Sequence, residues 1–134
     1  MQADLFSARS AASSITYPPA PVLKPHDWPY PGMSPEDSAR ASLSRSSEYI
    51  EVVALAILSR GGDLMTGAEV LAAIPEDWRK LLGPWAHGSM SQRQGEARGI
   101  EVKYVYHEGA GGFHFQYRAL DESALRPAVH KERP

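Results

Sequence analysis

The chain has 134 residues, contains no cysteine and carries a formal net charge of −2. This length fits one domain with some additional tail, and the absence of cysteine excludes disulfides and thiolate metal ligands. No apolar run reaches the roughly 18–20 residues that a membrane-spanning helix needs, and the N-terminus lacks the compact apolar run of a secretory signal. We expect a soluble, cytoplasmic protein with no membrane partner.

Residues 1–33 are rich in proline and lack a regular pattern. Seven of the eleven prolines lie within residues 16–35, and proline fixes φ and cannot donate a backbone hydrogen bond. We expect an extended or disordered arm, although it carries large side chains such as Trp28 and Tyr30. Two interpretations follow. The arm wraps its own domain or that of a dimer partner, or it docks on another protein, as segments of proline and aromatic residues do.

Helices are predicted along most of residues 34–83. Ser34 and Pro35 are a helix-start signal, but the serine-rich segment that follows predicts a weak helix. Residues 66–74 open with a capping box of Thr66 and Glu69, and residues 75–83 form a further short helix that ends at Gly83. The strongest helix is expected at 48–60, where five apolar residues at helical spacing form one stripe: Ile50, Val53, Ala54, Ile57 and Leu58.

Residues 89–98 predict a helix that is almost entirely polar. Ser89 and Gln92 form a capping box, and the helix ends at Gly99. Only Met90 and Ala97 are expected to face inward. Gly95 lowers the helix propensity by about 1 kcal/mol. Either it marks close packing against an earlier helix, or it only weakens this one.

Two alternating segments after Gly99 predict a β-hairpin with a glycine-rich tip, and the tail at 121–134 is expected to be flexible. One face of the hairpin is apolar: Ile100, Val102, Tyr104, Tyr106, Phe113, Phe115, Tyr117 and Ala119. The other face is mainly polar: Glu101, Lys103, His107, His114, Gln116 and Arg118.

The order of these elements resembles the winged helix-turn-helix over about residues 46–120. The resemblance is carried by "TGAEVLAAI" as the second helix, "SMSQRQGEARGIEVKYVY" as the polar helix and first wing strand, and "EGAGG" as the wing tip. It implies a mainly α fold with a small β-hairpin over residues 34–120, preceded by the proline-rich arm. The sequence departs from the family in its long "PEDWRKLLGPWAHG" connection, in Gly95 and in its slight acidity.

The resemblance implies a transcriptional regulator that binds specific double-stranded DNA. In that family the polar helix enters the major groove and the wing contacts the DNA backbone or the minor groove. Residues 48–120 hold only seven basic and nine acidic residues, so we expect a homodimer, which doubles the contacts. The residues at contacting positions are Ser89, Ser91, Gln92, Arg93, Gln94, Arg98, Lys103, His114 and Arg118.

A second hypothesis assigns the same winged-helix fold to protein binding instead of DNA binding. The chain would be a protein-binding adaptor or inhibitor, of the kind found among accessory proteins of mobile elements. Its anchors would be aromatic residues: Trp28, Tyr30, Trp78 and Trp85. For Trp78 and Trp85 the opposing interpretation is that they fill the core between the short helices.

Metal binding and catalysis have little support in the sequence. The histidines lack a helical H-x-x-x-H pair, although His107 and His114 lie on facing strands and could approach each other. There is no G-x-S-x-G elbow, and "GAGG" at 109–112 lacks the lysine and the helix of a phosphate loop. We expect no enzyme activity, no cofactor and no metal site.

Overall fold

The computed structural model describes residues 15–107, 109 and 112–120 as helices with a three-stranded antiparallel sheet. The expected tail at 121–134 and the first 14 residues of the arm lie outside these residues. No helix in the described part of the chain is long and apolar enough to cross a membrane. The elements are α2 (Pro35–Leu43), α3 (Ser47–Leu58), β1 (Met65–Thr66), α4 (Gly67–Ala73), α5 (Glu76–Leu82), the 3-10 helix η1 (Gly83–Trp85), α6 (Gln92–Arg98), β2 (Ile100–Tyr106) and β3 (Phe113–Ala119).

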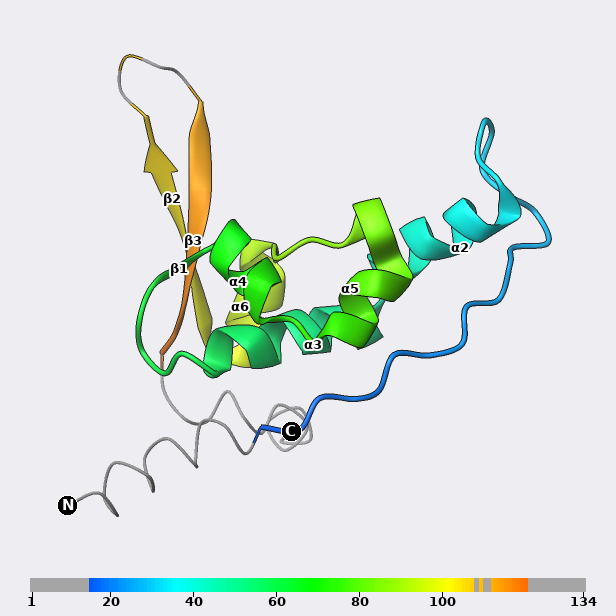
Figure 1. The fold of residues 1–134 in the computed structure, drawn as a ribbon. Helices are drawn as coiled ribbons and strands as arrows, with labels where there is room; N and C mark the ends of the chain where they lie inside the picture. Colours follow the sequence, from blue (N-terminus) through cyan, green and yellow to red (C-terminus); the bar gives the residue numbers. More distant parts are fainter. Residues whose placement is uncertain (1–14, 108, 110–111, 121–134) are drawn as a thin grey trace, which may run out of the picture.

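The hairpin of β2 and β3 projects from the helical body (Figure 1). Its pairing runs from Ile100↔Ala119 to Tyr106↔Phe113, which puts the alternating apolar side chains on one face, as predicted. The short strand β1 pairs with two residues of β3 and gives the sheet order β1-β3-β2. This third strand was not predicted, because two residues are too few to show an alternation.

The central helix α3 carries the predicted core stripe. All five residues of the stripe are buried, and Val52 and Ala56 beside them are fully buried. Burying one large aliphatic side chain contributes about 1.5–3 kcal/mol. The stripe is therefore a major source of stability, even though helix propensity alone would not hold a helix of this length.

Local signals predicted several helix ends correctly. The Thr66 hydroxyl accepts a hydrogen bond from the Glu69 N–H at 3.2 Å, and the Glu69 carboxylate accepts one from the Thr66 N–H at 2.9 Å. Gly61 follows α3 with φ +67, a left-handed conformation that glycine adopts with little cost.

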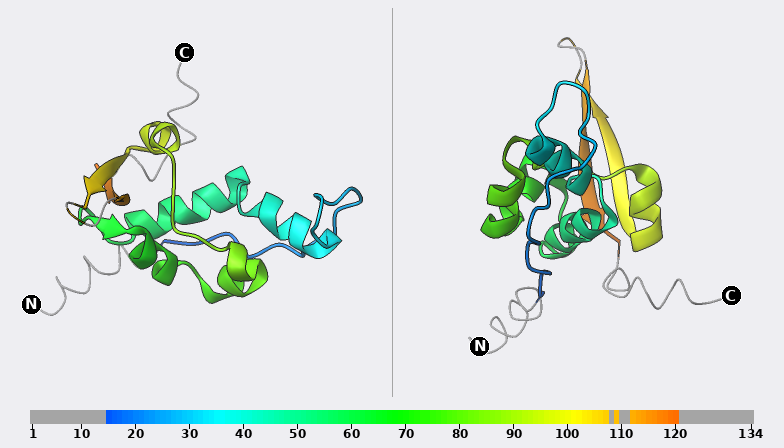
Figure 2. Two further views of the ribbon diagram at one scale, coloured as in Figure 1. Left: turned by 90° about the horizontal axis from the view of Figure 1, so that it is seen from above. Right: turned by 90° about the vertical axis from the view of Figure 1, so that its right-hand side faces the viewer.

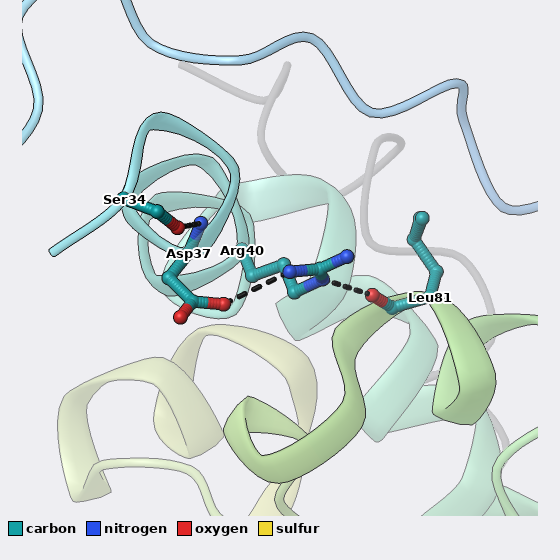
Figure 3. A network of polar contacts seen from close by, with 4 residues as sticks. All are labelled: Ser34, Asp37, Arg40 and Leu81. Carbon is teal, nitrogen blue, oxygen red and sulfur yellow. Dashed lines mark hydrogen bonds and ion pairs between the residues drawn. The ribbon is translucent and has the colours of Figure 1, made fainter.

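The first helix among the described residues, α2, is joined to α5 by a polar network (Figure 3). The Ser34 hydroxyl caps the helix by accepting the Asp37 N–H at 3.0 Å. The Asp37 carboxylate accepts a hydrogen bond from Arg40 at 2.9 Å. Arg40 also donates through Nε to the Leu81 carbonyl at 3.0 Å. These tertiary contacts explain why a serine-rich segment of weak propensity is a regular helix.

The described part of the proline-rich arm lies on its own domain. It runs along the body to the end of α2 that is far from the hairpin (Figures 1 and 2). Tyr17 and Ala20 pack against the core, and the Ala20 N–H donates to the Asp77 carboxylate at 3.1 Å. The Trp78 indole donates to the Pro18 carbonyl at 2.7 Å. The first interpretation of the arm, in its intramolecular form, is thus confirmed for these residues.

Trp78 is a core residue, so the expectation of an exposed partner-binding anchor at this position is wrong. It is fully buried, and its ring lies 5.7 Å from the Tyr49 ring. Trp85 is half-buried against the same core, and its buried Nε1 has no hydrogen-bond partner among the described residues. The core interpretation is thus confirmed for Trp78, whereas Trp85 packs against the edge of the core.

The segment at 86–91 connects η1 to α6, and hydrogen bonds from Tyr49 of α3 hold it in place. The Tyr49 hydroxyl donates to the His87 carbonyl and accepts from the His87 N–H at 3.2 Å. Burial raises the pKa of the Tyr49 hydroxyl, and its hydrogen bond to His87 opposes that shift. The His87 ring lies between the Ser44 carbonyl, at 2.9 Å, and the Ser89 N–H, at 3.1 Å. His87 therefore has a structural role.

Gly88 holds the other side of this segment against the start of α4. A Cβ atom at this position would lie 2.3 Å from the Gly67 carbonyl oxygen and 2.5 Å from the Leu71 nitrogen. Both neighbours are backbone atoms, which cannot move aside as a flexible side chain could. Only glycine allows the two segments to approach this closely.

Gly88→Ala should therefore lower the free energy of unfolding by about 1–3 kcal/mol or more, as overpacking does. Gly62→Ala is the matched control, because a Cβ there meets nothing within 4 Å. The control should change stability by no more than about 0.5 kcal/mol. Urea unfolding followed by circular dichroism measures both variants, and equal stabilities would contradict the close packing at Gly88.

Candidate nucleic-acid interface

The N-cap of the polar helix α6 lies two residues later than predicted. Ser91 is the N-cap: its hydroxyl accepts the Gln94 N–H at 3.1 Å, and the Gln94 amide oxygen accepts the Ser91 N–H at 2.9 Å. The sequence contains two overlapping S-x-x-Q patterns. Met90 is buried and Ser89 is bonded to His87, so the first pattern is held outside the helix. The expected capping box of Ser89 with Gln92 is therefore wrong.

The face that α6 turns to the core is formed by a glycine. A Cβ atom on Gly95 would lie 2.7 Å from the Ile100 carbonyl oxygen and 2.8 Å from a Val102 methyl group. Gly95 thus marks close packing, against β2 rather than against an earlier helix. Ala97, which was expected to face inward, is exposed, and Met90 is buried ahead of the helix.

The outer face of α6 is polar, and some of its side chains make no strong hydrogen bond or ion pair within the described residues. Exposed side chains here are Ser91, Gln92, Arg93 and Glu96. Arg93 has no ion pair within the described residues. The Gln92 amide lies 3.5 Å from the Val102 carbonyl, which is long for a hydrogen bond. Gln92 and Arg93 can therefore contact an outside molecule without breaking a strong internal bond.

Two other predicted contact residues of this helix have internal partners. Arg98 is 3.4 Å from the Glu51 carboxylate, donates to the Gln94 carbonyl at 3.1 Å, and has a side chain only 14% exposed. The Gln94 side chain is used in the helix cap. Arg93 is consequently the cation of α6 that is best placed to meet a ligand.

The predicted wing residues lie on the outer face of the hairpin, and most of them are paired. Arg118 binds the Glu101 carboxylate at 2.6 Å. His114 Nδ1 and His107 Nε2 are 2.7 Å apart, so the predicted approach of the two rings is confirmed. Within the described residues, Lys103 is exposed and has no ion pair, and no group of three or more ligand side chains is placed to hold a metal ion.

A groove of about 530 Å³ separates α6 from the outer face of the hairpin. Its polar lining includes Gln92, Glu96, Glu101 and Arg118. The two carboxylates disfavour a phosphate inside the groove, and Arg118 is already paired with one of them. The free cations, Arg93 and Lys103, belong instead to the two elements that flank it.

Trp28 is presented by a loop of the arm that is itself held in place. The Tyr30 N–H donates to the Ser38 hydroxyl at 2.8 Å, and the Tyr30 hydroxyl lies 2.9 Å from that of Ser42. The Arg45 guanidinium is 5.8 Å from the centre of the Tyr30 ring. Tyr30 thus anchors the loop, whereas Trp28 is 89% exposed and is free to contact a partner.

The apolar face of the hairpin is more exposed than the sequence pattern implied. Tyr104 is 43% exposed, Tyr106 73% and Phe113 48%. Alternation predicted the correct face for all three, but it could not show that the outer half of the hairpin extends past the helices. Only the tertiary arrangement reveals these residues as a candidate surface.

The two overlapping capping patterns can be separated by substitution. Ser91→Ala should cost about 0.5–2 kcal/mol of unfolding free energy, because it removes the cap of α6. Ser89→Ala should cost clearly less, since the Ser89 N–H keeps its bond to His87. Thermal or urea unfolding of the two variants decides between the patterns, and a larger loss for Ser89→Ala would place the helix start at residue 89 instead.

Comparison with protein-family models, curated proteins and solved structures found no match for this chain.

Proposed function

We propose that this protein is a winged-helix-like module that binds double-stranded DNA and acts as a transcriptional regulator. The chain order supports this proposal, since a buried helix (α3), a capped helix (α4), a polar helix (α6) and a hairpin follow one another. In this reading α6 is the recognition helix. The helix α5 and η1 form an additional element within the long connection before it.

The observation that carries the proposal is the orientation of α6. Gly95 places the helix directly on β2, so this contact with the core uses no polar side chain of the helix. The side chains that face outward are of the types that read DNA. Arginine pairs bidentately with guanine, glutamine with adenine, and serine at a helix start binds phosphate. Arg93, Gln92 and Ser91 supply these groups.

The number of free cations suggests that two copies act together. Within the described α6 and hairpin, Arg93 and Lys103 are the cations without an ion pair. Each phosphate contact contributes a slope of about −0.9 to the dependence of log K on log salt. One copy with two such contacts would bind weakly at physiological salt, whereas a two-fold dimer doubles the contacts and reads a palindrome.

The test is selection of the full chain against a random duplex library at low and moderate salt. We expect an enriched palindromic motif, and Arg93→Ala should weaken binding to it by about 1–3 kcal/mol, or roughly 5–150-fold. Arg60→Ala is the matched control, because it removes the same charge from an exposed arginine at the end of α3. It should leave the motif and the affinity nearly unchanged.

Two outcomes would count against DNA recognition by α6. One is the absence of any enriched motif at low salt from a folded protein. The other is an equal loss of affinity in Arg93→Ala and Arg60→Ala, because that would indicate attraction by net charge alone.

A second candidate function is protein binding through the arm, and Trp28 is the observation that favours it. A tryptophan held out by an ordered loop loses little conformational freedom on binding, which suits an interface anchor. Trp28→Ala should leave DNA selection unchanged and abolish capture of a protein partner. A partner still captured at full strength by this variant would exclude the loop as its docking site.

A further inference from the structure

We propose that His107 and His114, at the outer end of the hairpin, form a binding site for a divalent transition-metal ion of the Zn²⁺, Ni²⁺ or Cu²⁺ type. The ion links the two strands just before the loop that connects them. A helical H-x-x-x-H pair is absent from the sequence, but two strands can bring histidines together from separate segments. The inference goes beyond DNA binding and does not depend on it, because α6 supplies neither ligand.

The pairing of β2 with β3 brings the two imidazole rings together on one face. Val105 lies opposite His114 in the register of the hairpin. The His107 N–H donates to the Gly112 carbonyl at 3.1 Å, so the pairing continues past the last residue of β2. His107 is therefore the diagonal neighbour of His114, a position from which aromatic side chains reach each other across two strands. The two ring centres are 4.6 Å apart.

The ring nitrogens that face each other are placed as a pair of metal ligands. His114 Nδ1 and His107 Nε2 are 2.7 Å apart, a distance at which the two nitrogens share one hydrogen. Zn–N bonds of about 2.0–2.1 Å at a tetrahedral ion place two ligand nitrogens roughly 3.3 Å from each other. The rings therefore need to separate by only a fraction of an ångström for the ion to replace the shared hydrogen. His107 is exposed and His114 is half-buried, so this movement does not disturb the core.

The other nitrogen of His114 has a polar partner that suits a metal ligand. The Gln116 amide lies 3.4 Å from His114 Nε2. A half-turn of the amide brings its oxygen to this nitrogen, where it accepts the Nε2–H and leaves Nδ1 free of hydrogen. Histidines that bind metal ions commonly donate their second N–H to a carbonyl oxygen in this way, which fixes the ring and its tautomer.

The site is accessible from one side. The two histidines line a groove of about 570 Å³, and the hydroxyl-bearing residues Thr66 and Ser89 are also part of its lining. Two protein ligands leave the remaining positions of the ion to water, which the groove can admit. We therefore expect binding that is weaker than at a structural site with four protein ligands.

The donor set and the surrounding charges determine which ion fits. Imidazole nitrogen suits Zn²⁺, Cu²⁺ and Ni²⁺, whereas Mg²⁺ and Ca²⁺ need oxygen ligands. Among the described residues neither histidine has a carboxylate partner, and Glu101 on the same face is paired with Arg118 at 2.6 Å. Lys103 is exposed on this face, and its charge lowers the affinity for any cation. Selectivity for transition metals over Mg²⁺ and Ca²⁺ thus follows from the two nitrogens.

The position of the site indicates what a bound ion does for the fold. The hairpin projects from the body (Figure 1), and β1 pairs with β3 only at residues 116 and 117. Beyond that point the hairpin is a two-stranded ribbon, which is marginally stable in water on its own. An ion held by one residue from each side of the ribbon stabilises the folded form by mass action. Bound metal should therefore slow hydrogen exchange of backbone amides in the outer part of the hairpin.

Titration of the full chain, without an affinity tag, with ZnCl₂ and separately with NiCl₂ tests the site. Calorimetry should show one ion per chain, and NMR spectra of the backbone amides should change mainly around the two histidines. His107→Gln and His114→Gln should each weaken binding roughly tenfold or more, because a single imidazole remains. His26→Gln is the matched control. It removes an imidazole that packs against Tyr30 in the arm, and it should leave the affinity within about twofold, well under the ~1.4 kcal/mol of a tenfold change.

Two results would overturn the proposed site. One is the absence of saturable binding up to near-millimolar metal from a protein that circular dichroism shows to be folded. The other is binding that His107→Gln and His114→Gln weaken no more than His26→Gln does, because the ion would then lie elsewhere on the chain. Failure of the DNA proposal is distinguishable, because Arg93 is unchanged in all three variants. Saturable metal binding by a protein that selects no DNA motif would support this inference and disprove the DNA proposal alone.

Discussion

The close packing of the chain at Gly88 and Gly95 is the constraint on which the position of α6 depends. Gly88 brings the segment before α6 against the backbone of α4, and Gly95 brings the helix itself against β2. Tyr49 of α3 holds the same segment through His87. Because these contacts involve backbone atoms, α6 is supported along one side, and Gln92, Arg93 and Glu96 are left exposed on the other.

The hairpin that follows α6 has one charged face and one aromatic face. Strand alternation places the charged side chains on one face and the aromatic ones on the other. Near the base of the hairpin, the helical body covers the apolar face, whose side chains are part of the core. Further out nothing in the described structure covers it, and the same pattern of residues becomes a surface. The charged and the aromatic face of the hairpin can therefore have different roles on one small domain.

Much of the architecture could be predicted from local patterns. The stripe of α3, the capping box at Thr66 and the two faces of the hairpin depend on the spacing of residues close together in sequence. The start of α6 could not be predicted in this way, because Ser89 and Ser91 offer equally good caps. Burial of Met90 and the contact of Ser89 with His87 decide between them. His87 is close to Ser89 in sequence, but Tyr49 and the Ser44 carbonyl, which hold His87 in place, come from distant parts of the chain.

The candidate site shows the same division between local pattern and tertiary contact. The order of residues established that α6 is polar, and composition established that cations are few and cysteine is absent. Only the fold decided that Arg98 pairs with Glu51, that Trp78 is core and that Tyr106 is exposed. The physical reason is that periodicity depends on neighbours along the chain. Ion pairing and solvent exposure depend on which distant segments arrive beside a residue, and those segments meet only in the folded protein.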